Sequence, residues 1–227
     1  MGRSVNQKLT ILKAGSFPPI AWLGIALALL PLPIKRTMLL GEPEVLHWLA
    51  WDYGVRFIMI LGVVLVYEAG AMGPPPTRVF WQKAALIFVI AALGEWFLVF
   101  GEAILGDYLP SYFEYFAPPV IRDRYLLVLD LTLGIMLVAI SEELVFRRLV
   151  FSLLERFGLG KISVLFFSSA LFALVHITSG LDSLIVTFLH GLIFGAAFYS
   201  TGRLSVCIAL HYIGNFLVFG VFPSTSS

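Results

Sequence analysis

The residues best suited to do chemistry in this sequence are acids, histidines and one asparagine that interrupt strongly apolar runs. Glu142 and Glu143 are adjacent inside such a run, and Arg147 follows Glu143 by four residues. Side chains four apart share a helical face, so Glu143 and Arg147 can pair, whereas Glu142 points about 100° away around the helix. This spacing predicts one glutamate tied to the arginine and its neighbour free to react. The alternative is a structural salt bridge beside a merely tolerated Glu142.

Two later runs carry further polar side chains at the same helical spacing. His176 follows Phe172 by four residues, and Asn215 follows His211 by four. Alone, a histidine in a packed helix is commonly a hydrogen-bonded core residue, and a polar pair commonly bridges membrane helices. His190 adds a third histidine on another run.

The distances of these residues from the predicted turns bring them together. Glu142 and His176 each lie about 16 residues from a turn at Gly158 and Gly160, so they should lie at matching depth. His211 and Asn215 lie about 14–20 Å past a turn near Gly202. We therefore expect the functional groups of Glu142, His176, His211 and Asn215 to line one polar cavity, within about 10 Å of each other.

Such a constellation can hydrolyse an amide. A free carboxylate opposite a histidine can hold and deprotonate a water molecule. Donors from His211 and Asn215 can stabilise the oxyanion that forms when the water attacks a carbonyl. The pattern is therefore compatible with peptide hydrolysis inside a membrane.

The composition puts this chemistry in a bilayer. Of the 227 residues, 59% are hydrophobic and only 13% are charged, against about 45–50% and about 25% in soluble domains. The formal net charge of +1 gives no indication of nucleic-acid binding. Cys207 is the only cysteine, so an intrachain disulfide is excluded.

Seven apolar runs can be distinguished, and a membrane-spanning helix needs about 20 residues. The runs cover residues 17–34, 54–72, 82–105, 125–154, 162–178, 183–200 and 204–222. Because lipid leaves backbone polar groups unsatisfied, the prediction is an all-α polytopic transmembrane helix bundle of about seven spans. We expect a single integral membrane domain over residues 1–227, with accessory spans in 1–124 and a motif-bearing catalytic core, the last four spans, in 125–222.

The loop charges predict the orientation, because cytoplasmic loops are enriched in Lys and Arg. With the N-terminus inside, the cytoplasmic set is Arg3, Lys8, Lys13, Arg78, Lys83, Arg148, Arg156, Lys161 and Arg203. The opposite set is Lys35, Arg36, Arg56, Arg122 and Arg124. We therefore expect a cytoplasmic N-terminus. The membrane that we expect for this integral protein is a bacterial inner membrane.

At these residues the chain resembles the CPBP family of intramembrane glutamic endopeptidases, also called the Abi or CAAX-prenyl-protease-2-like family. The family pattern is EExxxR, FxxxH and HxxxN on separate membrane helices. Here it reads Glu142-Glu143-xxx-Arg147, Phe172-xxx-His176 and His211-xxx-Asn215. The order and spacing both match, over about residues 125–220.

The resemblance implies cleavage of a membrane-associated peptide or protein substrate without metal or cofactor. Glu142 would activate water with help from His176, and His211 and Asn215 would stabilise the oxyanion. Glu143 and Arg147 would orient the site, while His190 falls outside the three motifs. Prenyl-protein processing, peptide maturation and bacteriocin immunity all occur in the family, and the sequence selects neither among them nor an oligomeric state.

Three other interpretations stay open on the sequence alone. Glu142, His176 and His211 could ligate zinc, although no HExxH motif is present. Cys207 and His211, one turn apart, could form a thiol protease. Glu95 and Glu102, seven apart, could form a proton path in a transporter or belong to a non-catalytic immunity protein, and the 106–124 loop has no assigned role.

Overall fold

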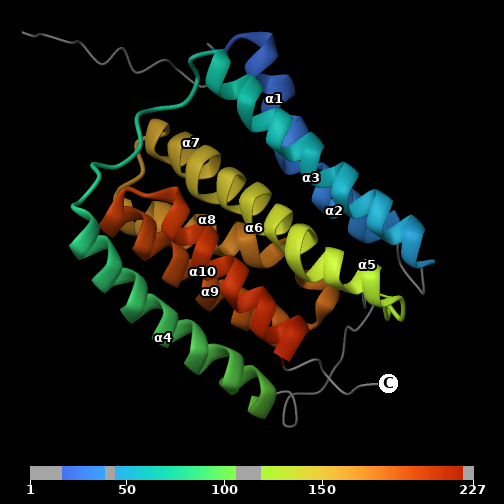
Figure 1. The fold of residues 1–227 in the computed structure, drawn as a ribbon. Coiled ribbons are helices and arrows are strands. Elements are labelled where there is room, and N and C mark those ends of the chain that lie inside the picture. Colours follow the sequence, from blue (N-terminus) through green and yellow to red (C-terminus); the bar gives the residue numbers. More distant parts are fainter. Residues whose placement is uncertain (1–16, 39–43, 106–118, 222–227) are drawn as a thin grey trace, which may run out of the picture.

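The computed structural model describes residues 17–38, 44–105 and 119–221, and over these residues it contains helices and no strand. The predicted all-α bundle is confirmed (Figure 1). Five helices are long and apolar enough to cross a membrane: Val45–Glu68, Trp81–Phe100, Arg124–Arg156, Ser183–Thr201 and Leu204–Val221. The first and fifth expected spans correspond to the shorter apolar helices Pro19–Lys35 and Lys161–Leu174.

The helices that precede the motifs form the two flanks of the bundle. They are α1 (Pro19–Leu29), α2 (Pro31–Met38), α3 (Val45–Glu68) and α4 (Trp81–Leu105). In Figure 1, α1 and α2 lie along α3 on one flank, and α4 lies on the opposite flank. Proline at the start of α1 and of α2 is well placed, because its missing N–H is not needed in the first turn.

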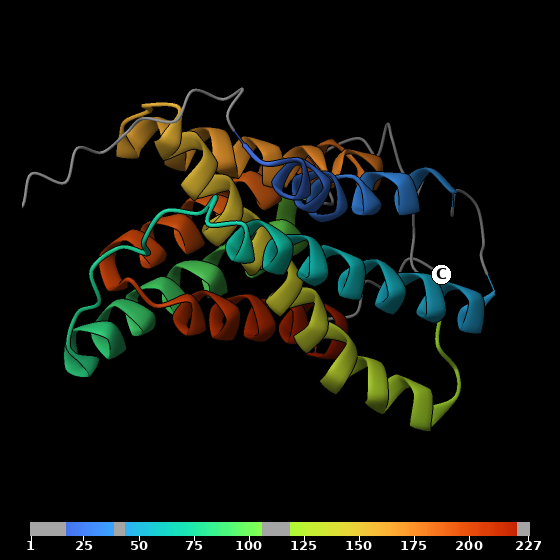
Figure 2. The same ribbon diagram turned by 90° about the horizontal axis from the view of Figure 1, so that it is seen from above.

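One long helix, Arg124–Arg156, occupies the middle of the bundle. It consists of α5 (Arg124–Leu129), α6 (Ile135–Glu143) and α7 (Phe151–Arg156), joined by π-helical turns at Asp130–Gly134 and Leu144–Val150. Asp123 caps its start by accepting hydrogen bonds from the backbone N–H groups of Tyr125 and Leu126. In Figure 2 the helix runs obliquely between α3 and α10. The second π turn follows Glu143 directly and includes Arg147, and such turns are frequent at functional sites.

The remaining helices pack on the other side of this central helix. They are α8 (Lys161–Leu174), the short 3₁₀ turn Ile177–Ser179, α9 (Leu181–Thr201) and α10 (Leu204–Phe216), which continues as a π turn to Val221. α9 lies between α8 and α4, and α10 contacts α4, α6 and α9. The turns near Gly158 and Gly202 occur where the sequence predicted them, and both glycines have positive φ.

Two apolar clusters hold the helices together. The first joins α1 and α3 to the central helix and α8, through residues such as Val66, Leu149 and Phe172. The second joins α4, α7, α9 and α10, through residues such as Phe151 and Phe198. The polar side chains described below lie between helices of these two clusters.

Candidate active site

Glu142, Glu143 and Arg147 of the central helix are enclosed completely by the bundle. Their exposed fractions are 1%, 0% and 0%. Glu143 Oε2 accepts a hydrogen bond from Arg147 Nε at 3.0 Å, which is the ion pair that the four-residue spacing predicts. Arg147 also reaches Ser168 of α8 at 3.4 Å, and its guanidinium lies over the Phe172 ring at 5.1 Å. Arg147 thereby fixes the central helix against α8.

Glu142 has a cationic partner that the sequence interpretation missed. Arg56 of α3 donates from Nη1 to Glu142 Oε1, and the Arg56 side chain is buried. The expectation that Glu142 is wholly free is therefore wrong, because a helix from the predicted accessory region neutralises it. Only the other oxygen, Oε2, is buried without a hydrogen-bond partner among the described residues.

Arg56 belongs to a longer line of buried charges. Asp52 Oδ1, one turn earlier on α3, lies 3.5 Å from Arg56 Nη2 and also accepts a hydrogen bond from Lys35 of α2. The sequence interpretation counted Lys35 and Arg56 as loop charges, which is wrong because they are only 3% and 4% exposed inside the bundle. The available signal was the Asp52–Arg56 spacing, four residues apart in an apolar helix. Without Lys35 and Arg56, the loop charges still favour a cytoplasmic N-terminus, and this orientation stays a prediction.

His211 of α10 faces both glutamates. Its Nδ1 lies 3.0 Å from Glu143 Oε1, and its Nε2 lies 3.8 Å from Glu142 Oε2. The ring stacks on Phe194 of α9 with centroids 5.2 Å apart, and it meets the edge of Phe172 at 5.8 Å. Two aromatic rings and a carboxylate thus hold the imidazole with Nε2 directed at the unpartnered oxygen of Glu142.

His176 reaches the same cluster from the end of α8. It lies two residues beyond Leu174, the last residue of α8, rather than within a continuous helix. Its Nδ1 lies 2.8 Å from the Phe172 carbonyl oxygen, and its ring packs on Phe172 with centroids 5.1 Å apart. It also interacts electrostatically with Glu142. A histidine in a turn can move more readily than one within a helix.

Asn215 lies one turn beyond His211 on α10 and is half-buried. It makes no hydrogen bond with the residues that the structure describes. The structure therefore brings His211 close to both Glu142 and Glu143. His176 is connected to this group by packing on the Phe172 ring, which His211 also contacts. The role of Asn215, like the single polar cavity around all four catalytic candidates, stays a prediction.

His190 pairs with an acid that precedes the motifs. Its Nδ1 lies 2.5 Å from Glu95 Oε2 of α4, and Glu95 is 2% exposed. The ring lies 6.0 Å from that of Phe194, the residue on which His211 stacks. Glu95 thus pairs with a histidine of α9. The side chain of Glu102 and residues 106–118 of the long loop lie outside the described residues.

The sites required by two of the other interpretations differ from what is observed. Cys207 is fully buried, and its Sγ lies 3.3 Å from the carbonyl oxygen of Phe194. In the part of the chain that the structure describes, no three histidine, cysteine or acidic side chains are grouped as metal ligands. The charged cluster therefore consists of carboxylates, arginines and imidazoles that pair with one another.

Comparison with protein families gives a match over the motif-bearing part of the chain. Residues 124–217 match the family described as type II CAAX prenyl endopeptidase Rce1-like. The match covers less than half of the 227 residues, but it contains all three motifs. The helices that carry Lys35, Asp52, Arg56 and Glu95 lie outside it. No curated protein and no solved structure matches the chain.

Proposed function

We propose that this protein is an endopeptidase in which Glu142 activates a water molecule to cleave a peptide bond of a membrane-associated substrate. The observation that carries the proposal is the state of the Glu142 carboxylate. One of its oxygens is bound by Arg56, and the other is buried, has no partner among the described residues and faces His211 Nε2 at 3.8 Å. Buried polar atoms are nearly always satisfied, so an orphaned carboxylate oxygen at such a place needs an explanation.

A water molecule beside Oε2 supplies that explanation. Glu142 takes one proton from the water, and the resulting hydroxide adds to the carbonyl carbon of the peptide bond. His176, which is near Glu142 and lies in a turn, assists in holding the water. When the tetrahedral intermediate collapses, the C–N bond breaks and Glu142 returns its proton to the leaving amine.

The oxyanion of that intermediate requires donors, and α10 carries the two candidates. His211 Nδ1 lies beside the Glu143 carboxylate, which orients the ring so that an N–H on Nε2 can point toward the reacting position. Asn215, one turn further, offers an amide N–H without competing hydrogen bonds among the described residues. Preorganised donors of this kind commonly contribute a factor of about 10²–10³ to the rate.

Glu143 and Arg147 act as positioning residues in this scheme. Glu143 bridges Arg147 and His211, so it sets the direction of the imidazole relative to the central helix. Arg147 prevents that bridge from being an isolated buried anion, which would be costly. The chemistry then requires no residue or cofactor beyond the cluster itself.

The test compares cleavage by wild type and by Glu142→Gln in the same membranes. Each is expressed at equal level, and new peptide termini in the membrane fraction are identified by mass spectrometry. We expect a set of termini that depends on wild type and is absent with Glu142→Gln, because glutamine keeps the shape but cannot take the proton.

Glu44→Gln is the matched control, because Glu44 is exposed at the start of α3. It should produce the same termini as wild type. Identical termini from Glu142→Gln and wild type, with both proteins folded, would refute the proposed function.

A further inference from the structure

We propose that the basic end of the bundle holds an anionic phospholipid, with its phosphate at Arg78 and part of an acyl chain in the adjoining cavity between α3 and the central helix. This site is separate from the charged cluster around Glu142. Its evidence is the shape, lining and charge of two cavities that share Arg78.

The larger cavity has the lining expected for a hydrocarbon chain. Its volume is about 300 Å³. Most of its wall is apolar, and only Arg78 and Arg148 contribute charge. The apolar lining comes from three parts of the bundle: Val63 and Val64 of α3, Leu144 of the central helix, and Phe198 and Leu204 of α9 and α10.

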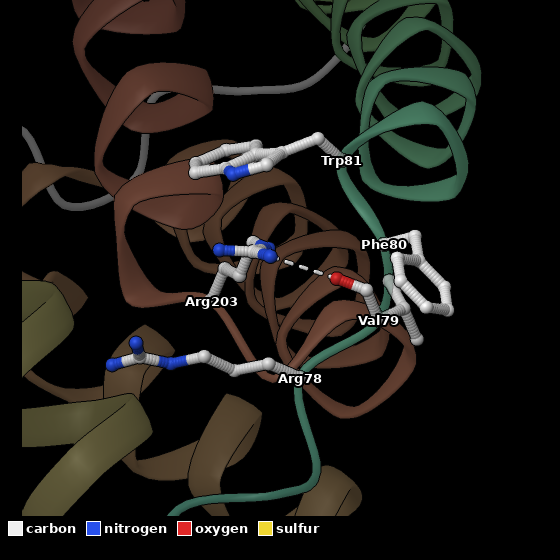
Figure 3. Close-up of a pocket in the computed structure, with 5 residues that line it drawn as sticks. All are labelled: Arg78, Val79, Phe80, Trp81 and Arg203. Atoms are coloured by element: carbon white, nitrogen blue, oxygen red, sulfur yellow. Dashed lines mark hydrogen bonds between the residues drawn. The ribbon is translucent and has the colours of Figure 1, made fainter.

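The smaller cavity extends the site on the other side of Arg78. Its volume is about 240 Å³, and its lining includes Trp81 and Arg203 (Figure 3). Arg203 is held in place, because its guanidinium stacks on the Trp81 ring at 3.7 Å and donates to the Val79 carbonyl at 2.8 Å. Among the described residues that line the two cavities, none is a carboxylate.

The segment that carries Arg78 is rigidly attached, so the site is already formed. Val79 N–H donates to the Thr201 carbonyl at 3.1 Å. Gly202 fits beneath the segment at φ +64°, where an added Cβ would lie 2.5 Å from the Pro76 carbonyl oxygen. Arg148 donates to the Gly73 carbonyl, so it is also fixed beside the larger cavity.

Arg78 is the one of these three arginines whose guanidinium has no hydrogen-bond acceptor among the described residues. Arg148 and Arg203 each bind a backbone carbonyl, whereas Arg78 is exposed and forms no hydrogen bond or ion pair with the residues that the structure describes. A ligand that places a phosphate at Arg78 and an acyl chain in the adjoining apolar cavity is a phospholipid. Basic pockets between membrane helices bind anionic lipid headgroups.

Native mass spectrometry of the purified protein tests the proposal without any measurement of proteolysis, so its outcome is independent of the proposed function. The probes are dioleoyl phosphatidylglycerol and dioleoyl phosphatidylcholine at equal concentration. We expect wild type to retain one phosphatidylglycerol in preference to phosphatidylcholine. Arg78→Gln should weaken that retention about fivefold, and Arg78→Lys should largely restore it.

Two further variants separate this site from general charge and from misfolding. Arg122→Gln removes an exposed arginine before α5, at the other end of the bundle, and should retain lipid like wild type. Val64→Trp fills the larger cavity and should reduce retention while the lipid-free melting temperature stays close to that of wild type.

The source of the bound anion is decided by competition. Inorganic phosphate or glycerol 3-phosphate at the lipid concentration should not displace phosphatidylglycerol, because neither fills the apolar cavity. Displacement by either one, equal retention of the two lipids, or equal losses in Arg78→Gln and Arg122→Gln would overturn the proposal.

Discussion

At the scale of single residues, the charges around Glu142 compensate one another across four helices. Three cations and three carboxylates are buried in one connected line: Lys35, Asp52, Arg56 and Glu142, then Glu143 and Arg147 across His211. A buried ion pair gives little net stability, but the removal of one partner is strongly destabilising. Substitutions in this line therefore separate residues that react from residues that hold others in place.

Arg56 should control the geometry of Glu142 beyond its charge. Arg56→Lys keeps a cation but loses the fork-shaped guanidinium that reaches both Asp52 and Glu142. We expect its thermal midpoint to stay near that of wild type and kcat to fall at least about tenfold with little change in KM, which is the pattern of lost transition-state stabilisation. Arg56→Gln should destabilise the fold by about 3–5 kcal/mol. A wild-type kcat in Arg56→Lys would show that Arg56 only neutralises charge.

Substitution of Glu143 and of Glu142 should lower the stability of the fold by different amounts. Glu143→Gln removes the anion shared by Arg147 and His211, whereas Glu142→Gln leaves Arg56 paired with Asp52. We therefore expect the melting temperature in detergent to fall more with Glu143→Gln. Both should lose cleavage activity, Glu142→Gln completely. The opposite order of melting temperatures would contradict this reading of the ion pairs.

At the scale of elements, run length predicted that helices occur in these regions but not all of their bounds. The helix α3 begins at Val45 instead of residue 54, and the first expected span is divided into α1 and α2. Glycine and proline predicted most breaks, and the four-residue spacing predicted the Glu143–Arg147 pair. The end of α8 before His176 was not predictable, because the apolar run continues past it. The contacts of Arg56 with Glu142 and of His190 with Glu95 were also missed, because they join helices far apart in the sequence. Arg56, His190 and Glu95 all lie outside the motifs.

The crossing of α1 and α3 depends on two glycines and provides a test at this scale. A Cβ on Gly62 would lie 2.5 Å from the Gly24 carbonyl oxygen, whereas a Cβ on Gly54 of the same helix meets nothing within 4 Å. We expect Gly62→Leu to separate the helices and lower the melting temperature markedly, because overpacking commonly costs about 1–3 kcal/mol. Gly54→Leu is the control and should melt like wild type. Equal melting temperatures for the two variants would mean that α1 does not pack on α3 in this way.

At the scale of the whole molecule, the chain is an integral membrane bundle whose motif-bearing segment depends on helices outside it. The sequence predicted the class of protein from two signals. The composition is a property of the whole chain, and the three ordered motifs are local. It did not predict that α3 supplies the partner of Glu142, since the accessory helices carry no motif. The division into accessory spans in 1–124 and a catalytic core in 125–222 therefore stays a prediction. The ion pair between Arg56 and Glu142 joins the two parts.

The predicted independence of metal and thiol is tested on the purified whole protein. We expect cleavage to survive prolonged dialysis against a strong chelator, because the proposed reaction uses only side chains and water. Cys207→Ser should keep most activity, since its Sγ contacts a backbone carbonyl oxygen. Activity that is lost on chelation and restored by zinc would support a metalloprotease instead, and an inactive but folded Cys207→Ser would support a thiol enzyme.

The line of charges also bears on how the protein is made. A charge at the centre of a membrane helix costs about 2.5–3.5 kcal/mol on insertion, and helices enter the bilayer as the chain is synthesised, N-terminal parts first. α3 carries Arg56 with its own Asp52, and the central helix carries Arg147 with its own Glu143, so each enters with an internal pair. On the central helix, Glu142 enters without such an internal partner, because its cation Arg56 is on α3. The carboxylate of Glu142 therefore gains its cation only when the central helix packs against α3. In a partly assembled bundle, the group that is proposed to activate water lacks that cation.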